Sequence, residues 1–263
     1  MYPFTYQRPD SVPAAIALLG DDAKLLAGGQ TLLPTMKQRL ASPATIVDIG
    51  RIAELAGIAR EGDSLVIGAM TRHADVAASP AVQQAIPALA ALAGMIGDPA
   101  VRSRGTIGGS LANNDPAADY PAAALALGAT IVTSKRELAA DAFFHGLFET
   151  ALEDGEIIVK VRFPIPEKAA YEKFRNPASR YALVGVFAAK TKAGARVAVT
   201  GAGSGGVFRA KALETALDGN FSAAALDGAS VPAEGLIADL HADAAYRAHL
   251  IVVLAKRAVT AAA

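Results

Sequence analysis

The sequence of 263 residues contains no cysteine. The chain by itself therefore cannot hold a thiolate-ligated iron–sulfur cluster, and it cannot form a disulfide of its own. Both absences fit a cytoplasmic protein, and we expect that location. The N-terminal residues also lack the basic start and apolar stretch of a secretory signal.

Neither sign of charge is in excess, since 25 Lys and Arg residues balance 25 Asp and Glu residues. Nothing in this balance favours nucleic acid or an anionic membrane surface as a partner. No charge-free apolar run reaches the length of a transmembrane helix, because Pro121 and Gly128 interrupt the nearest candidate. We therefore expect no nucleic-acid partner and no transmembrane segment.

The sequence also lacks a metal-ligand motif. The four histidines do not form H-x-x-x-H or another ligand spacing. They are His73, His145, His241 and His249. We expect no metal site and assign no catalytic nucleophile or general base.

What is present is an apolar, periodic chain, with 52% hydrophobic residues. This composition is typical of a folded globular protein. Apolar periodicity and turn residues predict alternating helices and strands. We expect helices over 11–20, 32–40, 73–97 (split at Pro80 and Pro87), 121–127 and 223–263; strands over 25–27, 45–50, 64–70, 129–134, 156–166, 181–191 and 195–203; and a turn-rich loop over 102–119.

One motif, Gly201–Gly206, matches the dinucleotide fingerprint G-x-G-x-x-G. It follows an apolar strand and precedes a helical pattern. The stretch after Leu217, however, has little β-branched character and is broken by Gly219 and Gly228. The next strand of a Rossmann unit is therefore missing. We interpret the motif as a strand-to-helix turn and keep an NAD-dependent dehydrogenase as the alternative.

Two plainer glycine pairs are better candidates for an anion site. Gly28-Gly29 follows a short strand and precedes a helix, a geometry that directs free N–H groups toward one point. Gly108-Gly109 lies in a second segment with hydroxyl, amide and carboxylate side chains, which ends near Asp119. Taken alone, each glycine pair is equally typical of an ordinary tight turn. Together they predict a pyrophosphate site with one segment on each side.

At these residues the sequence resembles the FAD-binding medium subunit of molybdenum hydroxylases, the xanthine dehydrogenase and aerobic carbon monoxide dehydrogenase family. The resemblance is carried by "AGGQTLLPTMKQRL" and "TIGGSLANNDPAADYPAAALALGA". It is supported by "FTYQRPDSVPAAIALL", "IGAMTRHADV" and "YEKFRNPASRYALVGV". It extends over nearly the whole chain.

The resemblance implies an α+β fold. Residues 1–168 would form a two-subdomain FAD-binding domain of the PCMH type, with subdomains of about 1–57 and 58–168. Residues 169–263 would form a smaller C-terminal domain of sheet plus helices.

The resemblance also implies FAD as the cofactor and a set of contacts to it. The first segment would bind the pyrophosphate mainly through backbone N–H groups, and Ser110 stands where many relatives have asparagine or aspartate. Asp119 would bond toward the adenosine end or the ribityl chain, and Ile96 would pack beside the flavin. The implied FAD-binding residues are Leu25, Leu26, Ala27, Gly28, Gly29, Gln30, Thr31, Leu32, Ile96, Thr106, Ile107, Gly108, Gly109, Ser110, Asp119, Ile158 and Lys173.

The implied activity is electron transfer within an oxidoreductase complex. A large molybdenum-cofactor subunit would oxidise the substrate, and a small iron–sulfur subunit would pass electrons to the flavin and on to an acceptor. The assembly would be a heterotrimer or a dimer of heterotrimers. The alternatives are the NAD-dependent dehydrogenase above and a non-enzymatic scaffold subunit without flavin.

Overall fold

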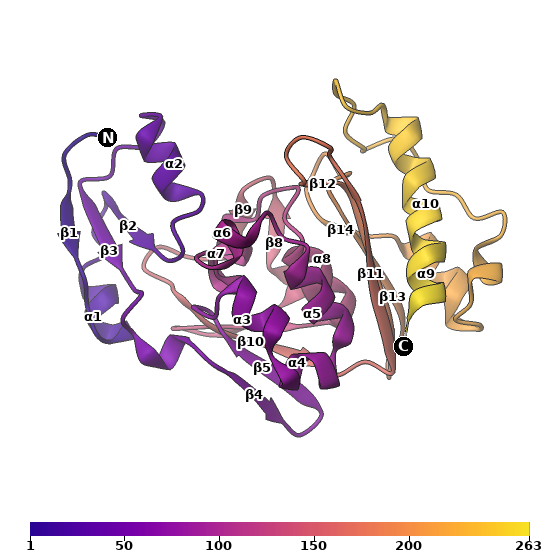
Figure 1. Ribbon diagram of the computed structural model, residues 1–263, viewed down its shortest axis with the longest axis horizontal. Helices are drawn as coiled ribbons and strands as arrows, with labels where there is room; N and C mark the ends of the chain where they lie inside the picture. Colours follow the sequence, from indigo (N-terminus) through magenta and orange to yellow (C-terminus); the bar gives the residue numbers. More distant parts are fainter. Residues whose placement is uncertain (263) are drawn as a thin grey trace.

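The structure, a computed structural model, describes residues 1–262; Ala263, the last residue of the expected C-terminal helix and domain, lies outside them. Three larger sheets follow one another along the long axis of the molecule, from the N-terminal strands on the left to the C-terminal helices on the right (Figure 1). The mixture of helices and strands confirms the expected α+β class. Among the helices of residues 1–262, none is long and apolar enough to cross a bilayer.

The first sheet is parallel and has the order β1-β3-β2. Its strands are β1 (Thr5–Gln7), β2 (Ala23–Leu26) and β3 (Thr45–Asp48), connected through α1 (Val12–Ala17) and α2 (Leu32–Lys37). Parallel neighbours need such crossovers, and the crossovers bring the carboxyl ends of all three strands to one edge. Gly28 follows β2 at this edge, so the fold of this sheet positions the first glycine segment.

The second sheet is antiparallel, with the order β4-β5-β10-β6-β7. Helices α3 to α8 pack on it or lead into its strands, and three of them begin at a proline, which suits the first helical position. The strands are β4 (Ile58–Glu61), β5 (Ser64–Gly68), β6 (Thr130–Thr133), β7 (Glu137–Ala139) and β10 (Ile158–Pro164); the helices are α3 (His73–Ala78), α4 (Pro80–Ala85), α5 (Pro87–Gly94), α6 (Pro99–Arg102), α7 (Ile107–Asn113) and α8 (Tyr120–Leu127). A small hairpin, β8 (Phe144–Gly146) with β9 (Glu149–Thr150), lies beside them.

The third sheet is an antiparallel meander of β11 (Lys168–Arg175), β12 (Ala182–Thr191), β13 (Gly194–Thr200) and β14 (Phe208–Arg209). Helices α9 (Lys211–Asp218) and α10 (Ala244–Ala261) contact this sheet at the C-terminal side of the molecule (Figure 1). Helix α8 contacts both β12–β13 and β10. All eight residues of α8 are buried, as expected of a helix that is apolar on every side. Helix α8 therefore joins the second and third sheets through one core.

Two regions differ from the sequence expectation. The second glycine pair lies inside α7 rather than in a loop, because Thr106 caps this helix and accepts a bond from the Gly109 N–H. Residues 223–243 are mostly irregular, with only a 3₁₀ turn at Ala223–Leu226. Gly228 and Gly235 both have positive φ there, which interrupts a helix.

The Gly201–Gly206 stretch is a turn within the third sheet. It follows β13, which pairs antiparallel with β12, so the parallel βαβ unit of a dinucleotide fingerprint is not formed here. Gly201 has φ +81°, and a Cβ atom on it would lie 2.3 Å from the Ala182 carbonyl oxygen. The glycines thus allow close backbone packing, and the Gly201 N–H donates to Pro116 O just before α8.

The variant Gly203→Val tests this structural role. Its Cβ atom would lie 2.4 Å from Gly206 O and 2.8 Å from the Phe208 ring. We expect a loss of about 3 kcal/mol in the free energy of unfolding, measured by urea denaturation. An NAD titration should detect no binding to either protein, whereas wild-type NAD binding abolished by this substitution would restore the dinucleotide interpretation.

Candidate functional site

The two glycine segments are in direct contact, although they belong to different sheets. A Cβ atom on Gly28 would lie 2.3 Å from Arg104 O and 2.7 Å from the Gly105 Cα atom. A Cβ atom on Gly109 would lie 3.6 Å from the Ala27 Cβ atom. Only a residue without a side chain fits at Gly28, and the contact brings the two segments together as a pair.

The first segment carries unused hydrogen-bond donors. Within residues 1–262, the backbone N–H groups of Gly29, Gln30 and Thr31 donate to no acceptor. Gly29 adopts φ +72°, which favours glycine and turns the chain into α2. Leu25, Leu26 and Leu32 are half-buried on either side of this turn. The expected cradle of backbone N–H groups is therefore present in this segment.

The second segment is built differently. Each N–H group of residues 107–109 donates inside the protein, to Thr71 O, Ala69 O and Thr106 Oγ1 respectively. In the described chain, the Thr106 N–H and the Ser110 hydroxyl donate to nothing. The second segment is thus held by internal hydrogen bonds and offers fewer free donors than the first segment.

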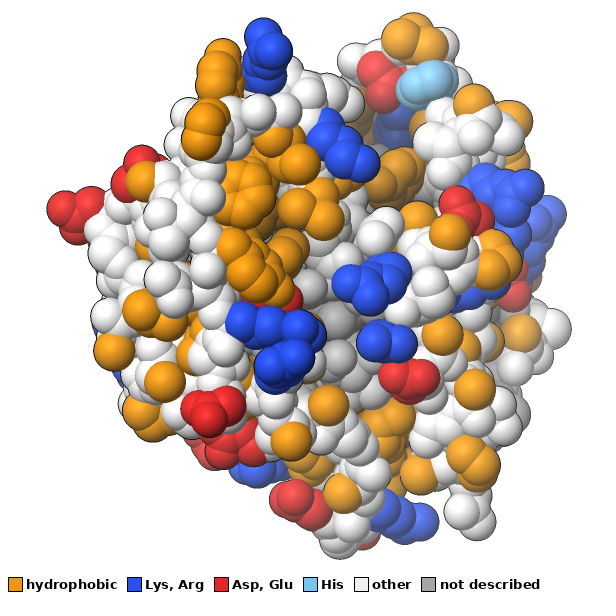
Figure 2. All heavy atoms as spheres, turned by 60° about the vertical axis from the view of Figure 1, so that its left-hand side comes forward, with side chains coloured by type: hydrophobic (Ala, Val, Ile, Leu, Met, Phe, Trp, Pro, Cys, Tyr) orange, Lys and Arg blue, Asp and Glu red, His pale blue; other side chains and the backbone are white. Residues whose placement is uncertain are grey.

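A cavity of about 580 Å³ adjoins this junction, between the carboxyl edge of the first sheet and the start of α3. It is lined by Gly28 and Thr106 and by the arginines Arg8, Arg72 and Arg104. Arg8 pairs with Asp48 at 3.3 Å, whereas the Arg72 and Arg104 guanidinium groups have no partner among residues 1–262. Figure 2 shows basic side chains gathered around a hollow on this side of the molecule.

Arg72 and Arg104 are site candidates that sequence reasoning missed. Arg72 lies within the quoted segment "IGAMTRHADV" and Arg104 within the expected loop over 102–119, but neither arginine was singled out as a site residue. Unpaired guanidinium groups suit a phosphate-bearing ligand, because their N–H fork matches phosphate oxygens. Their approach to Gly28 depends on the packing of two sheets, which no local pattern encodes.

A second cluster joins three segments that are far apart in sequence. Lys173 Nζ lies 2.9 Å from Asp119 Oδ2 and donates to Met95 O at 3.3 Å. The Tyr171 hydroxyl donates to Asp119 Oδ1. Ile96 directly follows Met95, and the Arg102 guanidinium donates to Ile96 O. The structure therefore brings Ile96, Asp119 and Lys173 close together.

This cluster is almost completely shielded from solvent. The side chains of Lys173 and Asp119 are 1% and 4% exposed. Burial raises the pKa of Asp119, and the Lys173 ammonium and the Tyr171 hydroxyl oppose that rise. Burial also raises the pKa of Tyr171 well above its ordinary value, so this phenol stays protonated and donates. Each Asp119 oxygen keeps a free lone pair for one further donor.

Ile158 backs the site through β10. It is buried in the same apolar cluster as Ile107 and Leu111 of α7. Its neighbour Ile157 belongs to the apolar cluster against which Leu25 and Ala27 pack. Strand β10 thus supports both glycine segments from below. In residues 1–262 no group of three or more His, Cys, Asp or Glu side chains is placed to hold a metal ion.

Comparison with known proteins finds a matching family model and several relatives. A family model described as "FAD binding domain in molybdopterin dehydrogenase" matches residues 2–166. The carbon monoxide dehydrogenase medium chain of Hydrogenophaga pseudoflava is 40% identical over 98% of this chain and 96% of that one. The nicotine 6-hydroxylase medium subunit of Paenarthrobacter nicotinovorans is 34% identical over 98% of this chain and 96% of that one.

Solved structures show the same fold. Carbon monoxide dehydrogenase from Hydrogenophaga pseudoflava, lacking the Mo-pyranopterin moiety, superposes with a TM-score of 0.89 at 41% identity, covering 99% of this chain and 98% of that one. Quinoline 2-oxidoreductase from Pseudomonas putida 86 superposes with a TM-score of 0.88 at 31% identity, covering 98% and 96%.

The buried pair generates a stability prediction. Lys173→Met leaves Asp119 buried without its cation, and we expect a loss of about 3 kcal/mol in unfolding free energy at pH 7. The double variant Asp119→Asn with Lys173→Met should recover most of it. In Lys173→Met the pKa of Asp119 rises further, so the folded state binds the proton better. The deficit should therefore shrink as pH falls toward the ordinary carboxyl pKa.

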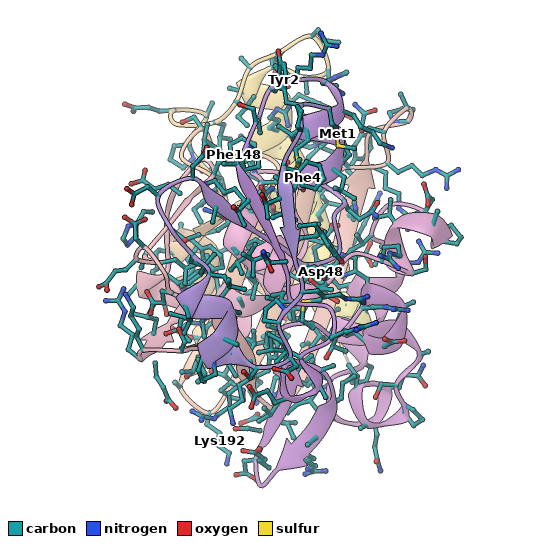
Figure 3. All side chains as sticks on the ribbon, turned by 90° about the vertical axis from the view of Figure 1, so that its left-hand side faces the viewer. Met1, Tyr2, Phe4, Asp48, Phe148 and Lys192 are labelled. Atoms are coloured by element: carbon teal, nitrogen blue, oxygen red, sulfur yellow. The ribbon has the colours of Figure 1, made fainter. Side chains whose placement is uncertain are left out.

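The control for this prediction is the exposed pair of Lys192 and Asp63, whose side chains are 78% and 80% exposed. Lys192 projects from the periphery of the molecule (Figure 3). Lys192→Met should change the unfolding free energy by no more than about 0.5 kcal/mol. Equal losses for the two lysine variants in urea denaturation would contradict the role assigned to the buried pair.

Proposed function

Because this chain belongs to the family of FAD-binding domains in molybdopterin dehydrogenases, we propose that it relays electrons between iron–sulfur clusters on a partner subunit and an external acceptor. It is an FAD-binding medium subunit of a molybdenum hydroxylase, and thus part of an oxidoreductase. FAD, when bound, supplies the redox chemistry. The absence of cysteine in the chain supports placing the clusters on another subunit.

The proposed partners are a large molybdenum-cofactor subunit and a small iron–sulfur subunit, in a heterotrimer or a dimer of heterotrimers. The printed names of relatives as medium chains or medium subunits support a multi-subunit complex. We propose a cytoplasmic location for this complex. Residues 1–168 would hold FAD, with subdomains of about 1–57 and 58–168, and residues 169–263 would form the smaller domain.

The observation that carries the proposal is the contact between Gly28 and the Arg104–Gly105 backbone, with free N–H groups beside it. A diphosphate can approach the backbone closely here because glycine places no side chain in the way. The first segment, Leu25 to Leu32, would donate N–H groups to it. The second, Thr106 to Ser110, would form the opposite wall.

The two unpaired arginines would supply positive charge at the pyrophosphate end of the proposed site. Arg72 and Arg104 line the cavity beside Gly28 and would balance the two negative charges of a pyrophosphate. The orientation of the cofactor would be fixed at the other end, where Asp119, Lys173 and Ile96 meet. Asp119 is held rigidly by Tyr171 and Lys173, so it would present its remaining lone pairs in a constant direction. Ile158 would support the site through β10.

Glycine variants test the proposed FAD site. Gly29→Val places a β-branched residue at φ +72° with its Cβ 2.8 Å from the Leu33 side chain. Gly109→Val places a side chain at the junction beside Ala27. We expect each purified complex to lose FAD, measured by flavin absorbance and by cofactor release on denaturation, while the chain still folds by circular dichroism.

Gly205→Val is the matched control, since a Cβ atom on Gly205 would have no neighbour within 4 Å. This variant should keep its full flavin content. Wild-type flavin content in both Gly29→Val and Gly109→Val would exclude the two-segment site.

Affinity purification of the tagged chain from its native host tests the partners. We expect co-purified chains that carry iron and molybdenum, identified by mass spectrometry and elemental analysis. The Gly109→Val complex should retain both metals but pass electrons to an acceptor at least tenfold more slowly, if flavin is the exit point. Recovery of the chain without an iron- or molybdenum-bearing partner would contradict the proposed complex.

A further inference from the structure

His73, the first residue of α3, fills the space behind the second glycine segment. It is 5% exposed, and its backbone N–H donates to Gly105 O at 2.9 Å. A Cβ atom on Gly105 would lie 2.5 Å from His73 Nε2. The imidazole therefore occupies the place where a side chain of residue 105 would lie.

Gly105 has a second contact, with the first glycine segment. Its Cα atom lies 2.7 Å from the position of a Cβ atom on Gly28. The backbone at Gly105 is thus packed against both Gly28 and the His73 ring. A shift of the imidazole changes the space available to Gly105, and with it the fit between the two segments.

The His73 ring also packs against Tyr120, beside the cluster of Asp119 and Lys173. Its centroid lies 5.3 Å from the ring of Tyr120, which directly follows Asp119. His73 Nδ1 and the Tyr120 hydroxyl are both buried and have no hydrogen-bond partner among residues 1–262. Unpartnered buried groups of this kind cost stability, so packing alone does not account for a histidine and a tyrosine at these two positions.

We infer that His73 is a positioning residue for the cofactor: its imidazole holds the Arg104–Thr106 turn against Gly28. The inference rests on the proposed function, because it assumes that FAD binds at the junction of the two glycine segments. His73 touches neither a reacting atom nor, in this arrangement, the cofactor itself. It acts through Gly105.

The charge state of His73 supports this role. Burial and, to a lesser extent, the Arg102 guanidinium on α6 together lower its pKa to about 4. Tyr120 faces the ring from α8, and burial and Asp119 keep that phenol protonated by raising its pKa. His73 therefore binds a proton less readily when its ring is packed against Gly105 than when it is exposed to water, where histidine has its ordinary pKa of about 6.5. The packing of the ring is stabilised fully above that pH, and this stabilisation is lost as the pH falls toward 4.

A double-mutant cycle tests the contact on the complete complex. His73→Ala removes the brace, and Gly105→Ala forces a Cβ atom into the imidazole. We expect each single variant to weaken FAD retention about tenfold, measured by flavin fluorescence after dilution. The double variant should bind FAD more tightly than the product of the two effects predicts, because the new methyl group fills the space that the ring has left.

Val76→Ala is the matched control, since Val76 is fully buried on the same helix. It should lower thermal stability while FAD affinity stays at the wild-type value. Equal FAD loss in His73→Ala and Val76→Ala, or multiplicative effects in the cycle, would overturn the inference and leave His73 a core residue. FAD retained in Gly29→Val and Gly109→Val would instead refute the site on which the inference rests.

A pH profile separates positioning from packing. The wild-type complex should release FAD progressively as the pH falls from about 6.5 toward 4. His73→Gln places an amide nitrogen near the former Nε2 and cannot take up a proton in this range. It should keep near-wild-type affinity at pH 7 and retain FAD at pH 5. Identical acid-release profiles for the two proteins would overturn the inference.

Discussion

The buried ion pair of Asp119 and Lys173 is the interaction on which the rest of the structure depends. It joins the first turn of α8 to β11 and so fixes the third sheet on the second. Two charges removed from water would ordinarily cost more than their attraction returns. Here the Tyr171 hydroxyl adds a hydrogen bond to the carboxylate and the Met95 carbonyl adds one to the ammonium group, so each charge has a hydrogen-bond partner in addition to the other charge. The pair also carries Ile96 to the same place, because Met95 directly precedes it.

The contact of Gly28 with the Arg104–Gly105 backbone does the equivalent work between the first and second sheets. It contains no charge and no side chain, and its specificity comes from the exclusion of a Cβ atom. The two junctions lie at opposite ends of a continuous run of contacts through Gly105, His73 and Tyr120. A ligand that spans both junctions would therefore contact residues from all three sheets. In this way a chain with three separate apolar cores can form one binding site.

The sequence predicted the parts of this site that local chemistry determines. The glycine pair after the short strand at 25–27 predicted free backbone N–H groups, and the family resemblance singled out Asp119, Ile96 and Lys173. The sequence did not predict that the N–H groups of Ile107 and Gly108 are used internally, since their acceptors lie nearly forty residues earlier in the chain. Arg72 and Arg104 were missed for the same reason, because their approach to Gly28 depends on contacts between segments that are distant in the sequence. Glycines 108 and 109 were read as a turn, whereas the Thr106 cap and close packing on Ala69 place them in a helix.

The unpaired arginines indicate that a bound anionic cofactor would contribute to the stability of the fold as well as to function. Without an anion, Arg72 and Arg104 bring two like charges to one cavity with no carboxylate assigned to either. In the proposed site, a diphosphate would supply the opposite charge and, through the free N–H groups of the first segment, would link the N-terminal sheet to the rest. Because a ligand that binds only the folded form stabilises it by mass action, a cofactor bound at the Gly28 junction would stabilise the packing of the two glycine segments. In this proposal the residues of the chain hold the cofactor, and the cofactor in turn stabilises the contact between the first and second sheets.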